Sequence, residues 1–197
     1  MKHSAGMLLI VLLCVSLAGC SQRSLPEQAA DGSPWSGGWT TVGNVVGVDV
    51  PEYVTPRENS DALSSRDMYY ATWSVGEGTP YVNADGDDAT AYDAQFYLLL
   101  AGYDSAEKAE EALADWQSLA ASQYDVTETT EVVCNGQAFT VITCTYRSET
   151  TPYQQGASAF GIYRNYAISV ELSCLDSSGG GAQPMLIDFL ERCHYAA

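Results

Sequence analysis

Histidine and basic side chains are scarce in this chain. Its 197 residues include 2 histidines and 8 lysines and arginines, against 25 aspartates and glutamates, for a formal net charge of −17. Such a surface repels nucleic acid and anionic lipid, so neither is expected as a direct partner of the folded domain. A Ser-His-Asp or Cys-His arrangement needs a positioned imidazole. The isolated His194 instead predicts an ordinary residue at the end of a helix.

Recognisable catalytic and cofactor motifs are also missing. The sequence contains no Walker, dinucleotide-binding or nucleophile-elbow pattern, so it implies no cofactor. Paired carboxylates for glycoside hydrolysis stay open, because their separation is a property of the fold. We therefore predict a protein that is not an enzyme.

The apolar stretch near the N-terminus is too short for a membrane-spanning helix. It covers residues 7–15, against the ~20 residues that a span needs, and it follows Lys2 and His3 as in a secretory signal. It ends in Leu17-Ala18-Gly19-Cys20, a sequence that resembles the lipobox of bacterial lipoproteins. The resemblance implies cleavage before Cys20 and attachment of fatty acyl chains, such as palmitate, to that residue. At ~0.8 kcal/mol per buried CH₂, two or three chains hold a soluble domain firmly at a membrane.

The sequence divides into three parts. Residues 1–19 are expected to form the lipoprotein signal peptide, and residues 20–40 the lipidated Cys20 with a flexible tether rich in Ser, Gly and Pro. Residues 41–197 are expected to form a single α+β domain, which is long enough to bury a core. We expect this domain on the extracytoplasmic face of the cell membrane, with the lipid on Cys20 as its membrane contact.

The hydrophobic patterning predicts an antiparallel sheet of about six strands packed with helices. Asp104 as N-cap and the apolar face of Ala109, Leu113 and Trp116 predict a helix over 104–121, and a second helix is predicted over 183–194. Hairpin turns are expected at Asn135-Gly136 and at 164–165. Strands are expected over residues 45–50, 68–75, 94–101, 126–133, 138–146, 156–163 and 166–174. Few helices and many hairpins favour the α+β class.

Four cysteines of the mature chain are candidates for disulfides. They are Cys134, Cys144, Cys174 and Cys193, and an exported chain meets an oxidising compartment, so two disulfides are expected. The hairpin turn after Cys134 disfavours its pairing with Cys144. Cys193, on the apolar face of the second helix, is expected to join helix and sheet. Its partner is left open, as is the alternative of buried free thiols.

One acidic loop is a weak candidate for calcium. Asn83, Asp85, Asp87 and Asp88 present oxygen ligands around Gly86, but their spacing does not fit an EF-hand loop. A hairpin turn with solvated carboxylates is the favoured interpretation, so no metal is expected. The abundant aromatic residues either pack the core or form a stacking surface. Those considered for that surface are Tyr53, Tyr69, Tyr70, Tyr81, Tyr92, Tyr97 and Trp73.

Several segments between residues 41 and 195 resemble exported lipoproteins of the PsbP-like fold. The valine-rich stretch 46–53 runs into Pro51, the helix sequence 105–113 follows an apolar strand, and the hairpin 134–141 precedes a terminal amphipathic helix. The family often carries Gly-Trp or Gly-Tyr after the proline, where this chain has Glu52-Tyr53. The resemblance implies a PsbP-like α/β/α sandwich and a role in binding or assembly. It transfers no catalytic residues.

These observations favour a membrane-anchored, extracytoplasmic binding or accessory module without enzymatic activity. A protein or a glycan at the cell surface is left open as its partner. Two alternatives remain: an envelope assembly or structural factor without a small ligand, and a surface glycan hydrolase that uses paired carboxylates.

Overall fold

The computed structural model describes residues 39–43, 45–60, 67–83, 85–146, 151–175 and 181–196. The predicted signal peptide, Cys20 and most of the tether lie outside these ranges, so lipidation stays a prediction. Neither of the helices in the described ranges is both long and apolar enough to cross a membrane.

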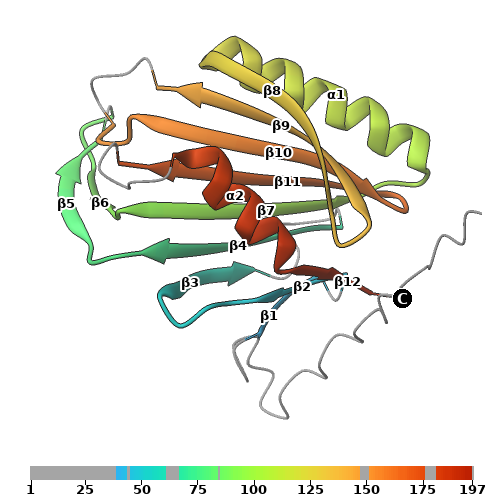
Figure 1. Cartoon of the computed structure of the whole chain (residues 1–197), viewed down its shortest axis with the longest axis horizontal. Helices are drawn as coiled ribbons and strands as arrows, with labels where there is room; N and C mark the ends of the chain where they lie inside the picture. Colours follow the sequence, from blue (N-terminus) through green and yellow to red (C-terminus); the bar gives the residue numbers. More distant parts are fainter. Residues whose placement is uncertain are drawn as a thin grey trace, which may run out of the picture.

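A seven-stranded antiparallel sheet forms the centre of the domain (Figure 1). This confirms the predicted α+β class, although about six strands were expected. The additional strand is β3 (Val54–Ser60), which pairs only with β4 and contains Pro56. Proline is tolerated at a sheet edge, and an edge strand needs no apolar pattern, so the sequence gives little sign of it. In sheet order the strands are β3, β4 (Met68–Val75), β7 (Ala94–Gly102), β11 (Tyr166–Cys174), β10 (Gln155–Tyr163), β9 (Gln137–Thr145) and β8 (Asp125–Cys134).

The two faces of this sheet are covered differently. Helix α2 (Ala182–Glu191) and a three-stranded sheet cover one face. That small sheet consists of β1 (Trp39–Val42), β2 (Val46–Asp49) and β12 (Cys193–Tyr195). Helix α1 (Ala106–Gln123) packs on the other face, over β9, β10 and β11. The arrangement is therefore helix, sheet, and a mixed third layer of one helix with a small sheet (Figure 1).

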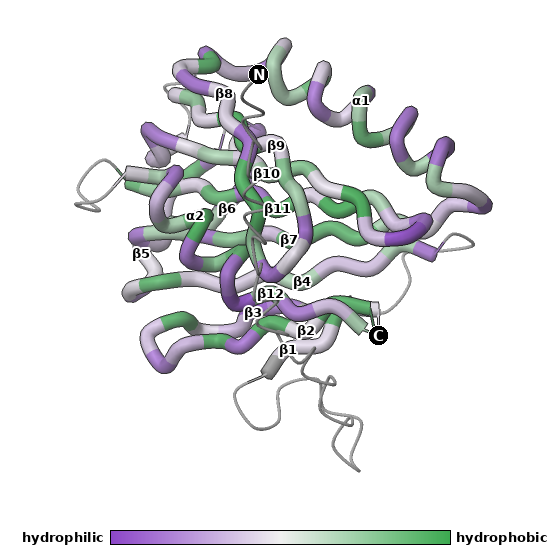
Figure 2. Tube along the Cα trace, turned by 45° about the vertical axis from the view of Figure 1, so that its right-hand side comes forward, coloured by the Kyte–Doolittle hydropathy of each residue, from purple (hydrophilic) through white to green (hydrophobic). Residues whose placement is uncertain are grey.

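The main core lies between the sheet and α2. Alternating residues of β7 and β11, such as Phe96, Leu98 and Val170, point into it because successive strand side chains face opposite sides. Phe189 of α2 stacks on Phe96 with ring centroids 4.5 Å apart. It also meets the fully buried Trp73 edge-on at 5.1 Å. Each fully buried side chain of this size contributes ~1.5–3 kcal/mol. Figure 2 shows the hydrophobic residues, in green, gathered along the central strands.

Helix α1 begins with a serine cap. The Ser105 hydroxyl accepts a hydrogen bond from the Lys108 backbone N–H at 3.3 Å, so Ser105 is the N-cap rather than Asp104. Asp104 instead forms an exposed ion pair with the Lys108 side chain at 2.8 Å. This pair holds the pKa of Asp104 below its ordinary value through a hydrogen bond and the lysine charge. Ala109 and Leu113 belong to the apolar face from which the helix is predicted, and this face packs on the sheet.

Helix α2 is shorter than the sequence suggests. It ends at Glu191, and Cys193 begins strand β12, which pairs with β2. The expected position of Cys193 on the apolar face of a helix is therefore wrong. Its thiol nevertheless donates to the carbonyl of Phe189, at 3.5 Å, and is fully buried. Cys193 keeps a core position because β12 continues directly from the end of α2.

Candidate functional site

Helix α1 covers only part of the sheet face on which it packs, and the rest of that face is open to solvent. Side chains on that face of β4, β7 and β11 keep solvent access beyond the edge of the helix, among them Tyr70, Tyr97 and Glu171. The opposite side chains of the same strands, such as Leu98 and Leu172, are fully buried under α2. The uncovered area is therefore the side on which a ligand can reach the central strands.

A hollow of about 230 Å³ opens between the C-terminal half of α1 and strands β7, β10 and β11. We call it the α1 hollow. Its walls combine apolar side chains from the helix and the sheet with two polar residues of β11. The residues that line it are Leu99, Trp116, Leu119, Ala120, Gln123, Tyr124, Phe160, Ser169 and Glu171.

Among the described residues that line the α1 hollow, Glu171 is the one acidic residue. Strand register places it between Tyr97 of β7 and Ser158 of β10. No hydrogen bond or ion pair reaches its carboxylate from the described residues. Its side chain remains accessible to solvent, yet the surrounding protein partly desolvates the carboxylate and raises the pKa of Glu171.

Three tyrosines surround Glu171 from different elements. Partial burial raises the pKa values of Tyr97, Tyr124 and Tyr146, and the negative charge of Glu171 raises each of them further. Tyr124 follows α1 and meets Tyr146 edge-on, with ring centroids 5.2 Å apart. All three phenols therefore stay protonated near neutral pH and form a group of neutral aromatic residues near one carboxylate.

Gly156 of β10 lets the Tyr146 ring lie close to the sheet. A Cβ atom at Gly156 would stand 2.8 Å from the Tyr146 hydroxyl oxygen, a separation that real Cβ atoms do not show. The Tyr146 hydroxyl shares a 2.5 Å hydrogen bond with the Ser173 hydroxyl, which lies across from Gly156 on β11. Glycine is therefore required at position 156 for the Tyr146 ring to lie where it does.

Ser169 is buried in the α1 hollow without a hydrogen-bond partner. The residue is 3% exposed, and none of the described residues forms a hydrogen bond with its hydroxyl. It lies two residues before Glu171 on the same face of β11, so the two Cβ atoms are about 7 Å apart. Buried hydroxyl groups are normally paired, so an unpaired one in a hollow indicates a place for a ligand group.

A second group of side chains continues this face toward the β3 edge. Tyr70 stacks on Tyr97 with centroids 5.8 Å apart, and its hydroxyl donates to Glu58 at 2.7 Å. Arg57 donates to the Ser74 hydroxyl at 2.6 Å and lies 4.5 Å from the ring centroid of Tyr92. Glu58 and Arg57, two charged residues toward this edge, are thus engaged in contacts within the protein.

The predicted aromatic surface forms only in part. Tyr70 and Tyr97 lie together, but Trp73 is buried in the core and Tyr69 packs against it. Tyr124 and Tyr146 were missed, since each lies next to the end of a different element. A signal existed for Glu171, because it is the one charged residue between Ala167 and Ser173 on the face opposite Ile168 and Val170.

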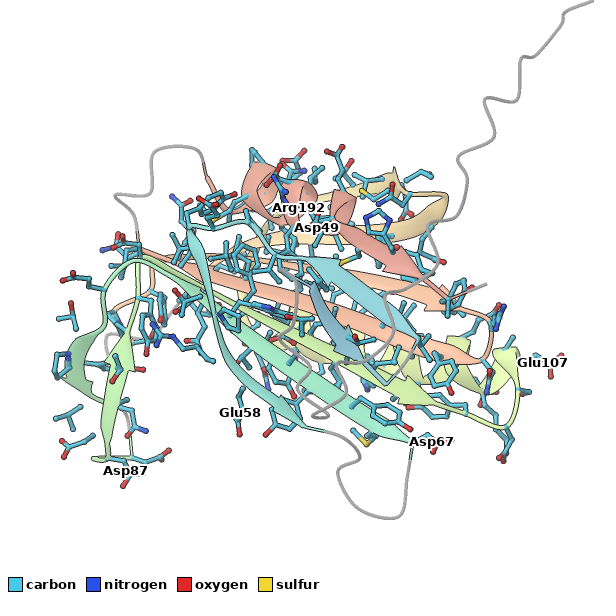
Figure 3. The ribbon with its side chains drawn as sticks, turned by 90° about the horizontal axis from the view of Figure 1, so that it is seen from below. Asp49, Glu58, Asp67, Asp87, Glu107 and Arg192 are labelled. Atoms are coloured by element: carbon cyan, nitrogen blue, oxygen red, sulfur yellow. The ribbon has the colours of Figure 1, made fainter. Side chains whose placement is uncertain are left out.

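The acidic loop forms a hairpin turn between β5 (Thr79–Val82) and β6 (Asp88–Ala91). The Asn83 side-chain oxygen accepts hydrogen bonds from the backbone N–H groups of Asp85 and Asp87, at 3.0 and 2.9 Å. Asp85, Asp87 and Asp88 are exposed, and Figure 3 shows Asp87 at the far end of this hairpin. The favoured interpretation as a turn is confirmed. In the described ranges, no cluster of three or more His, Cys, Asp or Glu side chains could hold a metal ion.

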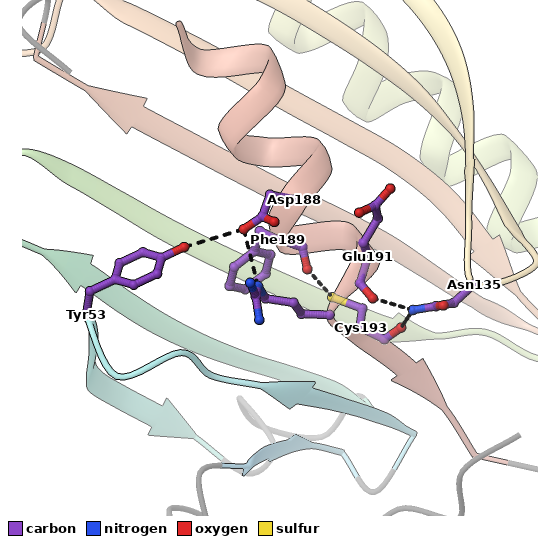
Figure 4. Close-up of polar contacts among 7 residues, drawn as sticks. Tyr53, Asn135, Asp188, Phe189, Glu191 and Cys193 are labelled. Atoms are coloured by element: carbon purple, nitrogen blue, oxygen red, sulfur yellow. Dashed lines mark hydrogen bonds and ion pairs between the residues drawn. The ribbon is translucent and has the colours of Figure 1, made fainter. Parts of the chain in front are cut away.

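The four candidate disulfide cysteines are buried free thiols in the structure. The register of the β8–β9 hairpin places Cys144 opposite Val126, far along the strand from Cys134. Asn135, next to Cys134, donates to the carbonyls of Glu191 and Cys193 at 2.6 and 2.9 Å (Figure 4). Cys134 therefore lies near Cys193, whereas Cys144 and Cys174 point to opposite faces of the sheet. Burial raises the pKa of Cys144 to about 11.

Comparison with known proteins gives a likeness in fold but no relative in sequence. No protein-family model matches the chain, and a search of curated proteins finds no match. The structure is similar to one from Bacteroides thetaiotaomicron, solved at 1.50 Å resolution, with a TM-score of 0.52 and 8% identity. That match covers 80% of this chain and 47% of the other, so this chain spans about half of its length. At this identity the likeness concerns the fold alone.

A second solved structure is less similar. It is the solution structure of cyanobacterial PsbP (CyanoP) from Synechocystis sp. PCC 6803, with a TM-score of 0.44 and 7% identity. The match covers 76% of this chain and 86% of that chain.

Proposed function

We propose that the protein is a lipid-anchored, extracytoplasmic binding module whose ligand occupies the α1 hollow. The observation that carries this proposal is the pair of unpartnered polar side chains in that hollow: the buried Ser169 hydroxyl and the Glu171 carboxylate. Apolar walls with a few convergent polar groups are the usual composition of a small-molecule site. The PsbP-like sandwich is part of this proposal, and the sheet between α1 and α2 supports it.

The composition of the hollow supports binding over glycan hydrolysis. Hydrolysis with paired carboxylates needs two acidic groups about 5–9.5 Å apart on either side of the scissile bond. The described residues that line the α1 hollow contain one carboxylate, that of Glu171. Glu58, farther along the same face, accepts a hydrogen bond from Tyr70. An envelope assembly factor without a small ligand would have no need for the unpaired Ser169 hydroxyl.

The binding site is tested with a substitution on α1 whose larger side chain would fill the hollow. Ala120→Phe places an aromatic ring where Ala120 lines the wall, while Ala121→Phe adds the same ring at the exposed neighbouring position. We expect small aromatic probes to shift the amide NMR signals of hollow residues saturably in the wild type and in the Ala121 variant. The Ala120 variant should lose these shifts. Equal shifts in both variants would place binding elsewhere.

Membrane attachment is tested separately at Cys20. Because the lipobox resemblance makes the acyl chains the membrane contact, Cys20→Ser should move the protein from the membrane fraction to the soluble fraction. The measurement is fractionation of the expressing cells followed by immunoblotting. Cys144→Ser, which changes a buried cysteine of the domain, is the control and should stay with the membrane. A membrane-bound Cys20 variant would contradict lipid anchoring.

A further inference from the structure

We propose that the ligand of the α1 hollow is a small organic ammonium ion with a compact apolar body, held between Glu171 and Ser169. This inference rests on the proposed function and adds the chemical class of the ligand. A primary ammonium group has three N–H donors and a single positive charge, which match a carboxylate and a hydroxyl that lack partners.

The charge of the hollow selects a cation. Glu171 lines it as a carboxylate, and its negative charge contributes to the raised pKa values of Tyr97, Tyr124, Tyr146 and the Cys144 thiol, which are therefore its electrostatic neighbours. All of these are neutral or become negative when they titrate. In the described part of the chain, no lysine or arginine neutralises Glu171. A net charge of −17 adds a long-range field that concentrates cations near the surface.

The aromatic rings around the carboxylate favour the same ligand. A cation near the face of a tyrosine or tryptophan ring is attracted by the ring quadrupole, and aromatic groups around an acidic residue are the usual site for organic ammonium ions. Tyr124 and Trp116 line the hollow, and Tyr97 adjoins Glu171 in the sheet register. A metal ion is a poorer match, because one carboxylate and one hydroxyl supply too few oxygen ligands for calcium or magnesium.

The remaining wall defines the body of the ligand. Leu99, Ala120 and Phe160 line the hollow with apolar atoms, and the exposed side chain of Leu119 adds to this wall. An apolar group attached to the ammonium nitrogen would replace water there, which is favourable for each buried CH₂. The ammonium group itself would lie toward Glu171, which keeps contact with solvent.

A second cavity provides a contrast. It measures about 240 Å³ and lies at the N-terminal end of α1, with Met68, Tyr103, Asp104 and Lys108 in its walls. Its two charges satisfy each other in the ion pair between Asp104 and Lys108. That cavity therefore has no uncompensated charge with which to select a ligand.

The experiment compares three probes of nearly equal shape at pH 7.5: benzylammonium, benzyl alcohol and benzoate. Isothermal titration uses the lipidated mature chain in zwitterionic nanodiscs, with empty nanodiscs as blank. We expect benzylammonium to bind at least tenfold more tightly than benzyl alcohol, and benzoate not to bind. Glu171→Gln should remove the advantage of the cation, while Glu110→Gln, an equal charge change on the exposed side of α1, should keep it. Ser169→Ala should lower the affinity for benzylammonium by at least threefold.

The outcomes separate this inference from the proposed function. Equal affinities of benzylammonium and benzyl alcohol, or equal losses in Glu171→Gln and Glu110→Gln, would overturn the ammonium ligand while the hollow remains a binding site. Absence of binding by all three probes would overturn both. Benzylammonium affinity should also fall as the pH is lowered through the pKa of Glu171, which lies above the ordinary glutamate value. An affinity that stays constant over this pH range would show that the Glu171 carboxylate does not hold the cation.

Discussion

Glu171 and Ser169 each place a polar group on β11 where none of the described residues offers it a partner. A buried hydroxyl without a hydrogen bond costs about 1–3 kcal/mol, and a partly desolvated carboxylate is destabilised relative to water. The sequence could predict the face on which both residues lie, because strand alternation separates them from Ile168, Val170 and Leu172. It could not show that Trp116, Tyr124 and Leu99 meet them there, since that contact depends on how α1 crosses the sheet.

At the residue scale, the raised pKa of Glu171 predicts a pH-dependent effect on stability. A carboxyl group with a higher pKa in the folded state than the ordinary value of ~4.3 destabilises the fold above its folded pKa. This penalty is lost as the pH falls through the folded pKa toward the ordinary value. Glu171→Gln removes the penalty, so we expect it to raise the melting temperature by about 1–2 °C at pH 7.5. At pH 3.5 the same substitution should leave the melting temperature unchanged.

Thermal unfolding at both pH values measures this difference. Glu110→Gln again serves as the control, because Glu110 is exposed on α1. A loss of stability in the Glu171 variant at pH 7.5 would indicate that the carboxylate has a favourable partner, which would contradict the description of the site.

At the element scale, the strongest sequence signals were local. The turn at Asn135 and Gly136 has φ values of 49° and 80°, as expected for a tight hairpin, and the turn at Arg164 has a φ of 58°. The sequence analysis predicts no strand at β1, β3, β5, β6 or β12, because these strands are short or exposed and depend on their partners rather than on their own pattern. The end of α2 was misjudged for the same reason: pairing of β12 with β2 overrides the helical periodicity that runs through Cys193.

The element arrangement also predicts which cysteines react. Cys134 closes β8 and Cys193 opens β12, and Asn135 connects the two segments through its hydrogen bonds. Burial raises the pKa of Cys193, with a further contribution from Cys134. In an oxidising compartment we expect these two to form a disulfide, worth about 2–4 kcal/mol, while Cys144 and Cys174 stay reduced.

Thiol titration of the denatured mature chain, without reductant, should therefore find two free thiols, not counting the lipid-bearing Cys20. Cys134→Ser should leave three, because it removes one thiol and releases Cys193. Cys144→Ser should leave one. Four free thiols in the unmodified protein would contradict the disulfide.

At the scale of the whole molecule, charge and anchoring act together. The formal charge of −17 repels anionic lipid, so we expect the acyl chains on Cys20 to hold a domain that otherwise stays clear of the bilayer. This repulsion can be predicted from the composition alone, because the net charge of the chain does not depend on its fold. The likeness to the Bacteroides thetaiotaomicron structure at 8% identity shows that the same arrangement of layers can arise from a very different sequence.

The two edges of the seven-stranded sheet, β3 and β8, each have one neighbouring strand. Both contain a register shift, between Pro56 and Glu58 and between Val126 and Glu128. Acidic side chains on β8, such as Glu128 and Glu131, add charge that discourages pairing with a second molecule. Near the sequence pI of about 4.1, the net charge of the whole protein falls to zero, so the repulsion between two molecules is lost. The edge then becomes a template for aggregation.

We therefore expect the protein to remain monodisperse at pH 7 and to form β-rich aggregates near pH 4, as followed by light scattering and thioflavin fluorescence. Glu128→Lys keeps a charge on the β8 edge at acid pH and should slow aggregation severalfold. Glu110→Lys makes the same charge change on α1 and should slow it less. If the two variants behaved alike, net charge rather than the strand edge would govern solubility. If instead the Glu128 variant aggregates more slowly than the Glu110 variant, the edge strand β8 sets the acidity that this protein tolerates.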